Sequence, residues 1–274
     1  MTTTPKLVIF TDLDGCLLDR QTYSFAPAQA ALRLLKEKKI PLVLVSSKTR
    51  VEMEGYRRKL KNDHPFVSEN GGAIFIPKGY FSFQFFHERE WEKYFVLELG
   101  TFYPQIIRAL EFIKKETGIR IRGFHDLSEA DLVFLSGLTR EEAAWAKERE
   151  YDEPFLIEGG EKEIKTVKKK IRERGLNYAW GGRFHHILGK NDKGKAAQIL
   201  KDLYKKEFSS IQTVGIGDSL NDLPMLSAVD HPVFLKGEED LSETSPVKNL
   251  VLLDGTGPQI WNKAILGVLR ELKI

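Results

Sequence analysis

The sequence contains little that would indicate a secreted, membrane-bound or disordered protein. Cys16 is the only cysteine among 274 residues, which excludes an intramolecular disulfide and gives no sign of an oxidising compartment. Basic and acidic residues nearly balance, 42 against 39, so the net charge of +3 does not indicate a nucleic-acid or membrane-surface partner. The apolar run near the N-terminus, KLVIF, is too short for a signal peptide or a membrane span. We therefore expect a cytoplasmic protein.

The composition that remains is that of a folded, globular chain. Hydrophobic residues make up 42%, charged residues 30% and aromatic residues 11% of the sequence, which disfavours disorder. The length permits either one large domain or a core with a second, smaller domain. We find no internal repeat, low-complexity tract or coiled-coil heptad.

Short apolar segments alternate with helical segments at both ends of the chain. KLVIFTD, PLVLV, IQTVGIG, VFL and NLVLL are typical of strands, and helices are predicted at 27–38, 49–60 and around 224–228. This alternation predicts an α/β fold in which a doubly wound parallel sheet is built from both chain ends.

The middle of the chain has a different pattern, with more aromatic and charged residues. Amphipathic helices are predicted at 105–116, 140–149 and 163–174, with short strands between them. We interpret residues 81–183 as an inserted domain, and residues 1–80 and 184–274 as the core domain.

The strongest local motif is DLDGCLLD, which begins at Asp12 directly after the first predicted strand. Ligands of open α/β sheets bind beyond the carboxyl ends of the strands, so Asp12 and Asp14 are expected to face such a site. A polar turn is the alternative, because Asp and Gly are common turn residues. A calcium loop fits less well, since no Glu stands at the expected spacing.

The second motif, GIGDSLND, places Asp218 directly after another apolar strand, with Asn221 and Asp222 following. Several carboxylates brought to one sheet edge repel one another unless a cation is present, and oxygen ligands favour Mg²⁺. The alternative is a simple helix N-cap at Asp218 or Asn221.

Two further segments carry groups suited to phosphate. VLVSSKTR offers the hydroxyls of Ser46 and Ser47 and the cation of Lys48, and GKNDKGKA places Lys193 at the start of a helix. The alternatives are an N-cap serine and a solvated lysine.

These motifs, in this order, resemble those of the haloacid dehalogenase superfamily of phosphohydrolases, and the resemblance covers the whole chain. The stretches SENGGAIFIPKGYF, EREYDEPF and GGRFHHILGKNDKGKAAQIL are more specific, and are similar to the mannosyl-3-phosphoglycerate phosphatases within it. The resemblance implies a Rossmann-like core with an inserted α+β cap domain. Cys16 departs from the family motif, which usually has Thr at this position.

The resemblance also implies roles for the motif residues. Asp12 would be the nucleophile, and Asp14 the general acid and base. Mg²⁺ would be held by Asp12, the main-chain carbonyl of Asp14 and Asp218. Residues expected to hold the phosphoryl group or support the site are Ser46 or Ser47, Lys193, Asn221 and Asp222.

Specificity is expected to depend on the cap. A phosphorylated sugar-glycerate carries a carboxylate and hydroxyls, so candidate substrate contacts are the cations and donors Lys48, Arg183, His185 and His186. Glu148 and Arg149 are candidates for the same pocket. Strand packing is the alternative for the histidines, and a surface salt bridge is the alternative for Arg183.

The implied function is Mg²⁺-dependent hydrolysis of mannosyl-3-phosphoglycerate, and of glucosyl-3-phosphoglycerate as a second candidate, in compatible-solute synthesis. Another sugar phosphatase, a phosphomutase and an inactive binding protein of the same fold are the alternatives. A small-molecule substrate is expected, without nucleic acid or membrane, and a homodimer is left open.

Overall fold

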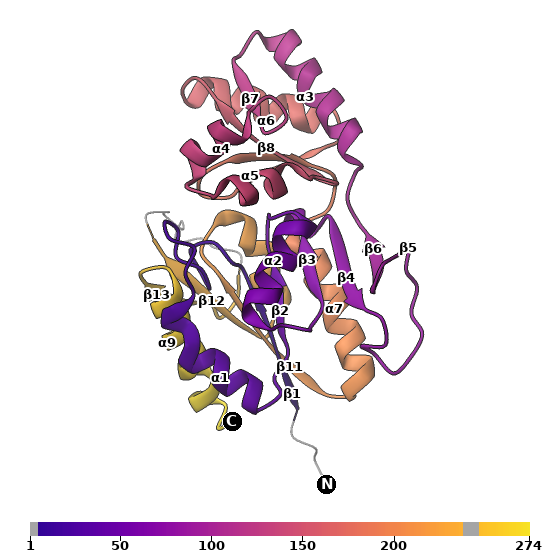
Figure 1. Cartoon of the computed structure of the whole chain (residues 1–274), viewed down its shortest axis with the longest axis vertical. Helices are drawn as coiled ribbons and strands as arrows, with labels where there is room; N and C mark the ends of the chain where they lie inside the picture. The colour runs from indigo at the N-terminus through magenta and orange to yellow at the C-terminus, as the bar shows by residue number, and fades with distance from the viewer. Residues whose placement is uncertain (1–4, 238–246) are drawn as a thin grey trace.

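The protein consists of two parts, each built on its own β-sheet with helices packed against it (Figure 1). We call these parts, each sheet taken together with its helices, the larger layer and the smaller layer. The computed structural model describes residues 5–237 and 247–274. The larger layer contains a nine-stranded sheet, whose strands in spatial order are β13 (Val251–Asp254), β12 (His231–Lys236), β11 (Ile211–Gly217), β1 (Lys6–Thr11), β2 (Leu42–Val45), β3 (Phe66–Ser68), β4 (Ala73–Pro77), β6 (Tyr94–Glu98) and β5 (Arg89–Trp91).

The strands from β13 to β3 are parallel, which confirms the predicted α/β core. Successive residues of β1 point to opposite faces of this sheet. Leu7 and Ile9 pack in one cluster with α1 (Gln29–Glu37) and α9 (Pro258–Glu271). Val8 and Phe10 pack in another with α7 (Lys193–Phe208) and α8 (Leu223–Ala228). Helices therefore cover both faces, with α1 and α9 on one side and α7 on the other (Figure 1).

Three 3-10 helices and one 11-residue α-helix also belong to the larger layer. They are η1 (Ala26–Ala28), η2 (Glu69–Gly71), η3 (Leu220–Asp222) and α2 (Arg50–Leu60). Thr49 caps α2, because its hydroxyl accepts a hydrogen bond from the Glu52 amide and the Glu52 carboxylate accepts one from the Thr49 amide.

The smaller layer spans residues 103–188 and contains a four-stranded antiparallel sheet. Its strands, in spatial order, are β7 (Ile121–Gly123), β8 (Asp152–Ile157), β10 (His185–Leu188) and β9 (Asn177–Trp180). The helices α3 (Tyr103–Thr117) and α6 (Glu161–Glu173) pack on this sheet through apolar side chains such as Leu110 and Val167. The helices α4 (Glu129–Ser136) and α5 (Arg140–Lys147) form a second cluster, and α5 contacts α2 of the larger layer.

The limits of the smaller layer differ from those expected for the inserted domain, 81 and 183. β5 and β6 extend the larger sheet by antiparallel pairing with β4, so residues 89–98 belong to the larger layer. Tyr94 is buried against the rings of Phe66 and Phe75, which fixes this extension. At the other end, β10 belongs to the smaller sheet, although residues from 184 onward are expected in the core. Among the described residues, no helix combines the length and the apolar character needed to cross a bilayer.

Candidate active site

The carboxylates predicted to converge lie together at the ends of two neighbouring strands. β1 and β11 pair in parallel with Thr11 opposite Ile216, so Asp12 and Asp218 follow at the same sheet edge. The Asp12 amide donates to the Ile216 carbonyl at 2.9 Å. One carboxylate oxygen of each aspartate and the Cys16 sulfur all lie within 4.8 Å of one another.

Lys193 joins two of the carboxylates at this edge. Its Nζ lies 2.6 Å from Asp12 Oδ1 and 2.6 Å from Asp222 Oδ1, and its side chain is only 1% exposed. The residue is the first of α7, whose N-cap is Asp192. Burial alone would lower the pKa of Lys193, but the carboxylates of Asp12 and Asp222 raise it above its ordinary value. The lysine therefore stays charged.

The site nevertheless holds more negative than positive charge. Three buried carboxylates, of Asp12, Asp218 and Asp222, face the ammonium of Lys193 and the guanidinium of Arg20, whose Nη2 lies 2.5 Å from Asp218 Oδ2. Burial, together with the neighbouring carboxylates, raises the pKa of Asp12 well above its usual range. Burial and the carboxylate of Asp222 raise the pKa of Asp218 to about 7. An additional cation would stabilise the ionised forms of both.

The donor set suits a hard divalent cation such as Mg²⁺. Carboxylate oxygens are the ligands that Mg²⁺ prefers, and Asp12 and Asp218 supply them within reach of one another. Burial raises the pKa of the Cys16 thiol, which donates toward Asp218 Oδ1 at 3.6 Å. The thiol therefore stays protonated and does not provide the thiolate that zinc sites use.

The glycine of the DLDG motif makes this arrangement possible. Gly15 has φ +83°, and a Cβ at this position would lie 2.1 Å from Asp218 Oδ2. Any side chain here would both strain the backbone and displace Asp218.

Asp14 lies apart from the buried carboxylates. Its side chain is 39% exposed, and its Oδ2 lies 2.9 Å from Lys48 Nζ. Its Oδ1 has no hydrogen-bond partner within the described residues. Lys48 is itself buried between the rings of Tyr23 and Tyr56, where its ammonium also faces Glu52 at 3.6 Å. Asp14 is thus held through Oδ2 by Lys48, while Oδ1 is buried and without a hydrogen-bond partner among the described residues.

A cavity of about 170 Å³ adjoins Asp14 at the junction of the two layers. The larger layer contributes Asp14, Ser47 and Lys48 to its wall, and the smaller layer contributes Arg149, Arg183 and His186. All of these residues are among the candidates named from the sequence. Their cations make the cavity suitable for an anionic ligand.

The two candidate serines differ in exposure. Ser46 is 1% exposed, and its Oγ accepts a hydrogen bond from the Lys48 amide at 3.3 Å. Ser47 lines the cavity that contains Asp14, and its carbonyl accepts a hydrogen bond from the Arg149 guanidinium at 2.7 Å. Of the two serines, Ser47 is therefore the one that lines this cavity.

Arg183 connects the two layers. Its guanidinium donates to the carbonyl of Ser136 at 2.5 Å, to the carbonyl of Arg20 at 3.0 Å and to the hydroxyl of Tyr23 at 3.3 Å. These contacts hold the loop after β1 against the end of α4, so the surface salt bridge considered for Arg183 is not what the structure shows.

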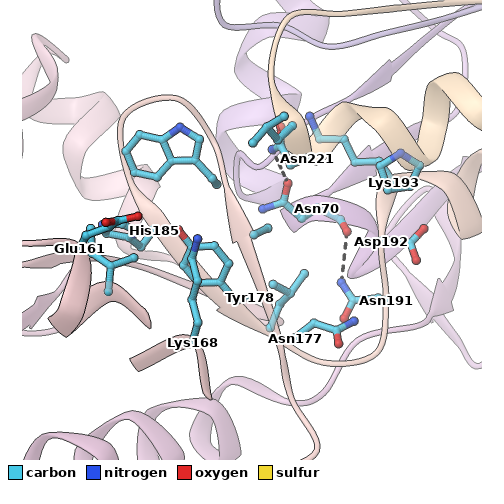
Figure 2. Close-up of a pocket in the computed structure, with 16 residues that line it drawn as sticks. Asn70, Glu161, Lys168, Asn177, Tyr178, His185, Asn191, Asp192, Lys193 and Asn221 are labelled. Carbon is cyan, nitrogen blue, oxygen red and sulfur yellow. Dashed lines mark hydrogen bonds between the residues drawn. The ribbon is translucent and has the colours of Figure 1, made fainter. Parts of the chain in front are cut away.

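Asn221 and His185 line a different, larger cavity of about 720 Å³ on the Lys193 side (Figure 2). The side-chain amide of Asn221 donates a hydrogen bond to Asn70 Oδ1 at 2.9 Å. His185 Nδ1 lies 2.7 Å from the Tyr178 hydroxyl, and burial lowers the pKa of His185 to about 4, so this histidine is neutral. The structure therefore does not bring His185 to Asp14.

Sequence reasoning missed two residues of this site. Arg20 lies in the loop after DLDG, where an isolated arginine gives no signal. Asn70 is 2% exposed and has φ 56° and ψ 37°, in the left-handed region. The Asn-Gly-Gly run in SENGG is typical of such backbone, and could have drawn attention to it.

Known proteins are similar to this chain over most of its length. The family model described as haloacid dehalogenase-like hydrolase matches residues 9–241. A protein of Methanococcoides burtonii, named glucosyl-3-phosphoglycerate/mannosyl-3-phosphoglycerate phosphatase, is 47% identical over 265 residues, which are 96% of this chain and 97% of that protein. A mannosyl-3-phosphoglycerate phosphatase of Pyrococcus furiosus is 37% identical and covers 89% of this chain and 98% of its own length.

Solved structures show the same fold at low identity. A protein of Thermoplasma acidophilum has a TM-score of 0.67 and 19% identity, covering 98% of this chain and 99% of its own. A sugar phosphatase of haloacid dehalogenase subclass IIB has a TM-score of 0.63 and 16% identity, covering 97% of this chain and 98% of its own. The chain belongs to the family of haloacid dehalogenase-like hydrolases.

Proposed function

We propose that the protein is a Mg²⁺-dependent phosphatase that hydrolyses glycosyl-3-phosphoglycerates through a phosphoaspartate on Asp12. The observation that carries the proposal is the buried carboxylate cluster. Asp12 lies within reach of Asp218 and is held by Lys193, while Asp14 of the same motif is held by Lys48.

In the first step, an oxygen of the Asp12 carboxylate forms a bond to phosphorus, and the bond from phosphorus to the ester oxygen breaks. Asp14, which Lys48 holds through Oδ2, gives a proton to the leaving alcohol. Lys193 holds Asp12 in place and reduces the repulsion between its carboxylate and the incoming phosphate.

In the second step, water attacks the phosphorus of the phosphoaspartate. Asp14, now ionised, takes a proton from this water, and the bond between phosphorus and Asp12 breaks to release phosphate. When bound by Asp12, Asp218 and the Asp14 carbonyl, Mg²⁺ would supply neutralisation of the charge on the phosphoryl oxygens. Asp222 positions the backbone at Asp218, since its Oδ2 accepts hydrogen bonds from the backbone amides of Asp218 and Ser219 at 3.0 Å each.

The cavity beside Asp14 supports a sugar-glycerate substrate. A 3-phosphoglycerate carries a carboxylate close to the phosphate, and the cations of Lys48, Arg149 and Arg183 line this cavity. The printed names of the relatives point to the same class of substrate. We further propose that the smaller layer, residues 103–188, is the cap that excludes water and selects the substrate.

Free phosphate release tests the proposal. We expect the purified protein to release phosphate from mannosyl- and glucosyl-3-phosphoglycerate with Mg²⁺, and to lose this activity after chelation. Asp12→Asn should abolish release while the thermal unfolding transition stays cooperative. Transfer of the phosphate to another position of a sugar would support the phosphomutase alternative instead, and tight binding without turnover would support an inactive binding protein. Cytoplasmic location and a role in compatible-solute synthesis stay predictions.

A further inference from the structure

Asn70 occupies the turn between β3 and β4, where it meets three segments of the larger layer. Its backbone amide donates to the Ser46 carbonyl at 3.0 Å, which fixes the end of β2. Its backbone carbonyl accepts a hydrogen bond from the side-chain amide of Asn191 at 3.2 Å. Asn191 lies two residues before Lys193 in the sequence. The Oδ1 of Asn70 accepts a hydrogen bond from the side-chain amide of Asn221 at 2.9 Å. Figure 2 shows Asn70 between Asn221 and Asn191, with both hydrogen bonds drawn.

The same side chain also reaches the smaller layer. Asn70 Nδ2 donates to Asp152 Oδ2 at 2.6 Å, at the first residue of β8. Asp152 is fully buried, and its carboxylate lies 2.9 Å from His186 Nδ1 and 3.8 Å from Arg149 Nη1. A buried carboxylate with these partners has a defined position, because moving it away would leave it without them.

Asn70 is thus one point at which a chain of hydrogen bonds connects the smaller layer with the larger layer. From Asp152 it leads through Asn70 to Asn221, and Asn221 precedes Asp222, whose carboxylate holds Lys193. The amide of Asn70 is suited to this, since one end donates to the carboxylate and the other accepts from Asn221. A carboxylate or an alkyl group at position 70 could not do both.

We propose that Asn70 is a positioning residue that couples the placement of the smaller layer, through Asp152, to the placement of the phosphate-binding groups around Asp12. The inference rests on the proposed phosphatase activity. Displacement of reacting groups by about 1 Å can cost about 100-fold in rate, so loosening this chain should lower turnover.

The test uses Asn70→Gly, because glycine adopts the left-handed backbone and removes only the side chain. With a small aryl phosphate as substrate, we expect kcat to fall at least about tenfold, as for loss of supporting hydrogen bonds elsewhere, with a smaller change in KM. The matched control is Asn62→Ala. Asn62 is also buried, and its amide donates to the Leu42 carbonyl at 2.8 Å, away from the chain of hydrogen bonds. Its kcat should stay at the wild-type value.

Changes at Asp152 test the coupling from the other layer. Asp152→Ala should lower kcat on the aryl phosphate to a similar extent, and Asp152→Asn should restore part of it because an amide can still accept from Asn70. The double variant Asn70→Gly/Asp152→Ala should lose little more than either single variant.

The outcomes separate this inference from the proposed function. If the wild-type protein does not turn over any phosphoester, the proposed function fails. If it does, but Asn70→Gly and Asp152→Ala keep wild-type kcat at a temperature well below unfolding, the positioning role is wrong. Independent, multiplicative losses in the double variant would also contradict the coupling.

Discussion

Replacing Lys193 by Met tests the electrostatics of the site most severely. Methionine keeps a similar length and removes the charge that lies 2.6 Å from both Asp12 and Asp222. Removing one partner of a buried ion pair costs about 3–5 kcal/mol, because it leaves the other charge buried and unpaired. Asp12 can reduce this cost by taking up a proton, and a protonated Asp12 is not a nucleophile. We therefore expect lower stability and loss of turnover in one variant.

The pH dependence of the unfolding free energy tests whether Asp12 takes up a proton in this variant. Loss of Lys193 raises the folded-state pKa of Asp12 further above its unfolded value. A carboxyl group with a raised folded pKa loses stability as pH rises through the window between the two values. The stability deficit of Lys193→Met should therefore shrink as pH is lowered toward the unfolded-state pKa of the carboxyl group, as measured by urea unfolding at a series of pH values.

The control is Lys195→Met, which removes a lysine of the same helix turn whose side chain is 56% exposed. Its unfolding free energy should change by less than about 1 kcal/mol. An equal, pH-independent loss in the two variants, or wild-type turnover by Lys193→Met, would refute the account of Lys193.

Three further predictions concern other parts of the molecule. Asp14→Asn should slow phosphate release by about 10²–10⁴-fold, since it removes proton transfer; full activity would exclude Asp14 as the acid. Gly15→Ala should weaken Mg²⁺ binding in a titration, because its Cβ would lie 2.1 Å from Asp218 Oδ2, whereas Gly267→Ala, with open space around its Cβ, should leave it unchanged. Partial burial lowers the folded pKa of His64 to about 4, so acidification from pH 7 to pH 5 should cost about 1–2 kcal/mol of stability through preferential protonation of the unfolded state. His64→Gln should remove this part of the pH dependence in urea unfolding; an unchanged slope would show that His64 is not responsible.

The core strands and the carboxylates at their ends could be predicted from the sequence because each signal is local. A β-branched apolar run ending in Asp indicates a buried strand and the group at its carboxyl end, as for β1 with Asp12 and β11 with Asp218. That the two aspartates meet depends only on the parallel pairing of their strands.

Other parts depend on contacts between distant segments and gave no such signal. The antiparallel extension by β6 is fixed by the packing of Tyr94 on Phe66 and Phe75. The C-terminal helix α9 was missed, although its buried Trp261 donates to the Thr11 hydroxyl at 2.8 Å beside Asp12. The hydrogen-bond partners of Asn70 likewise come from distant segments, at residues 46, 152, 191 and 221.

The formation of a phosphoryl bond at Asp12 is the central claim, and rapid acid quenching during turnover of a sugar phosphoester tests it directly. Mass spectrometry of the quenched protein should find the mass of one added phosphoryl group on the peptide that contains Asp12, and none in Asp12→Asn. An active enzyme that never carries this mass, or that carries it on another residue, would contradict the account.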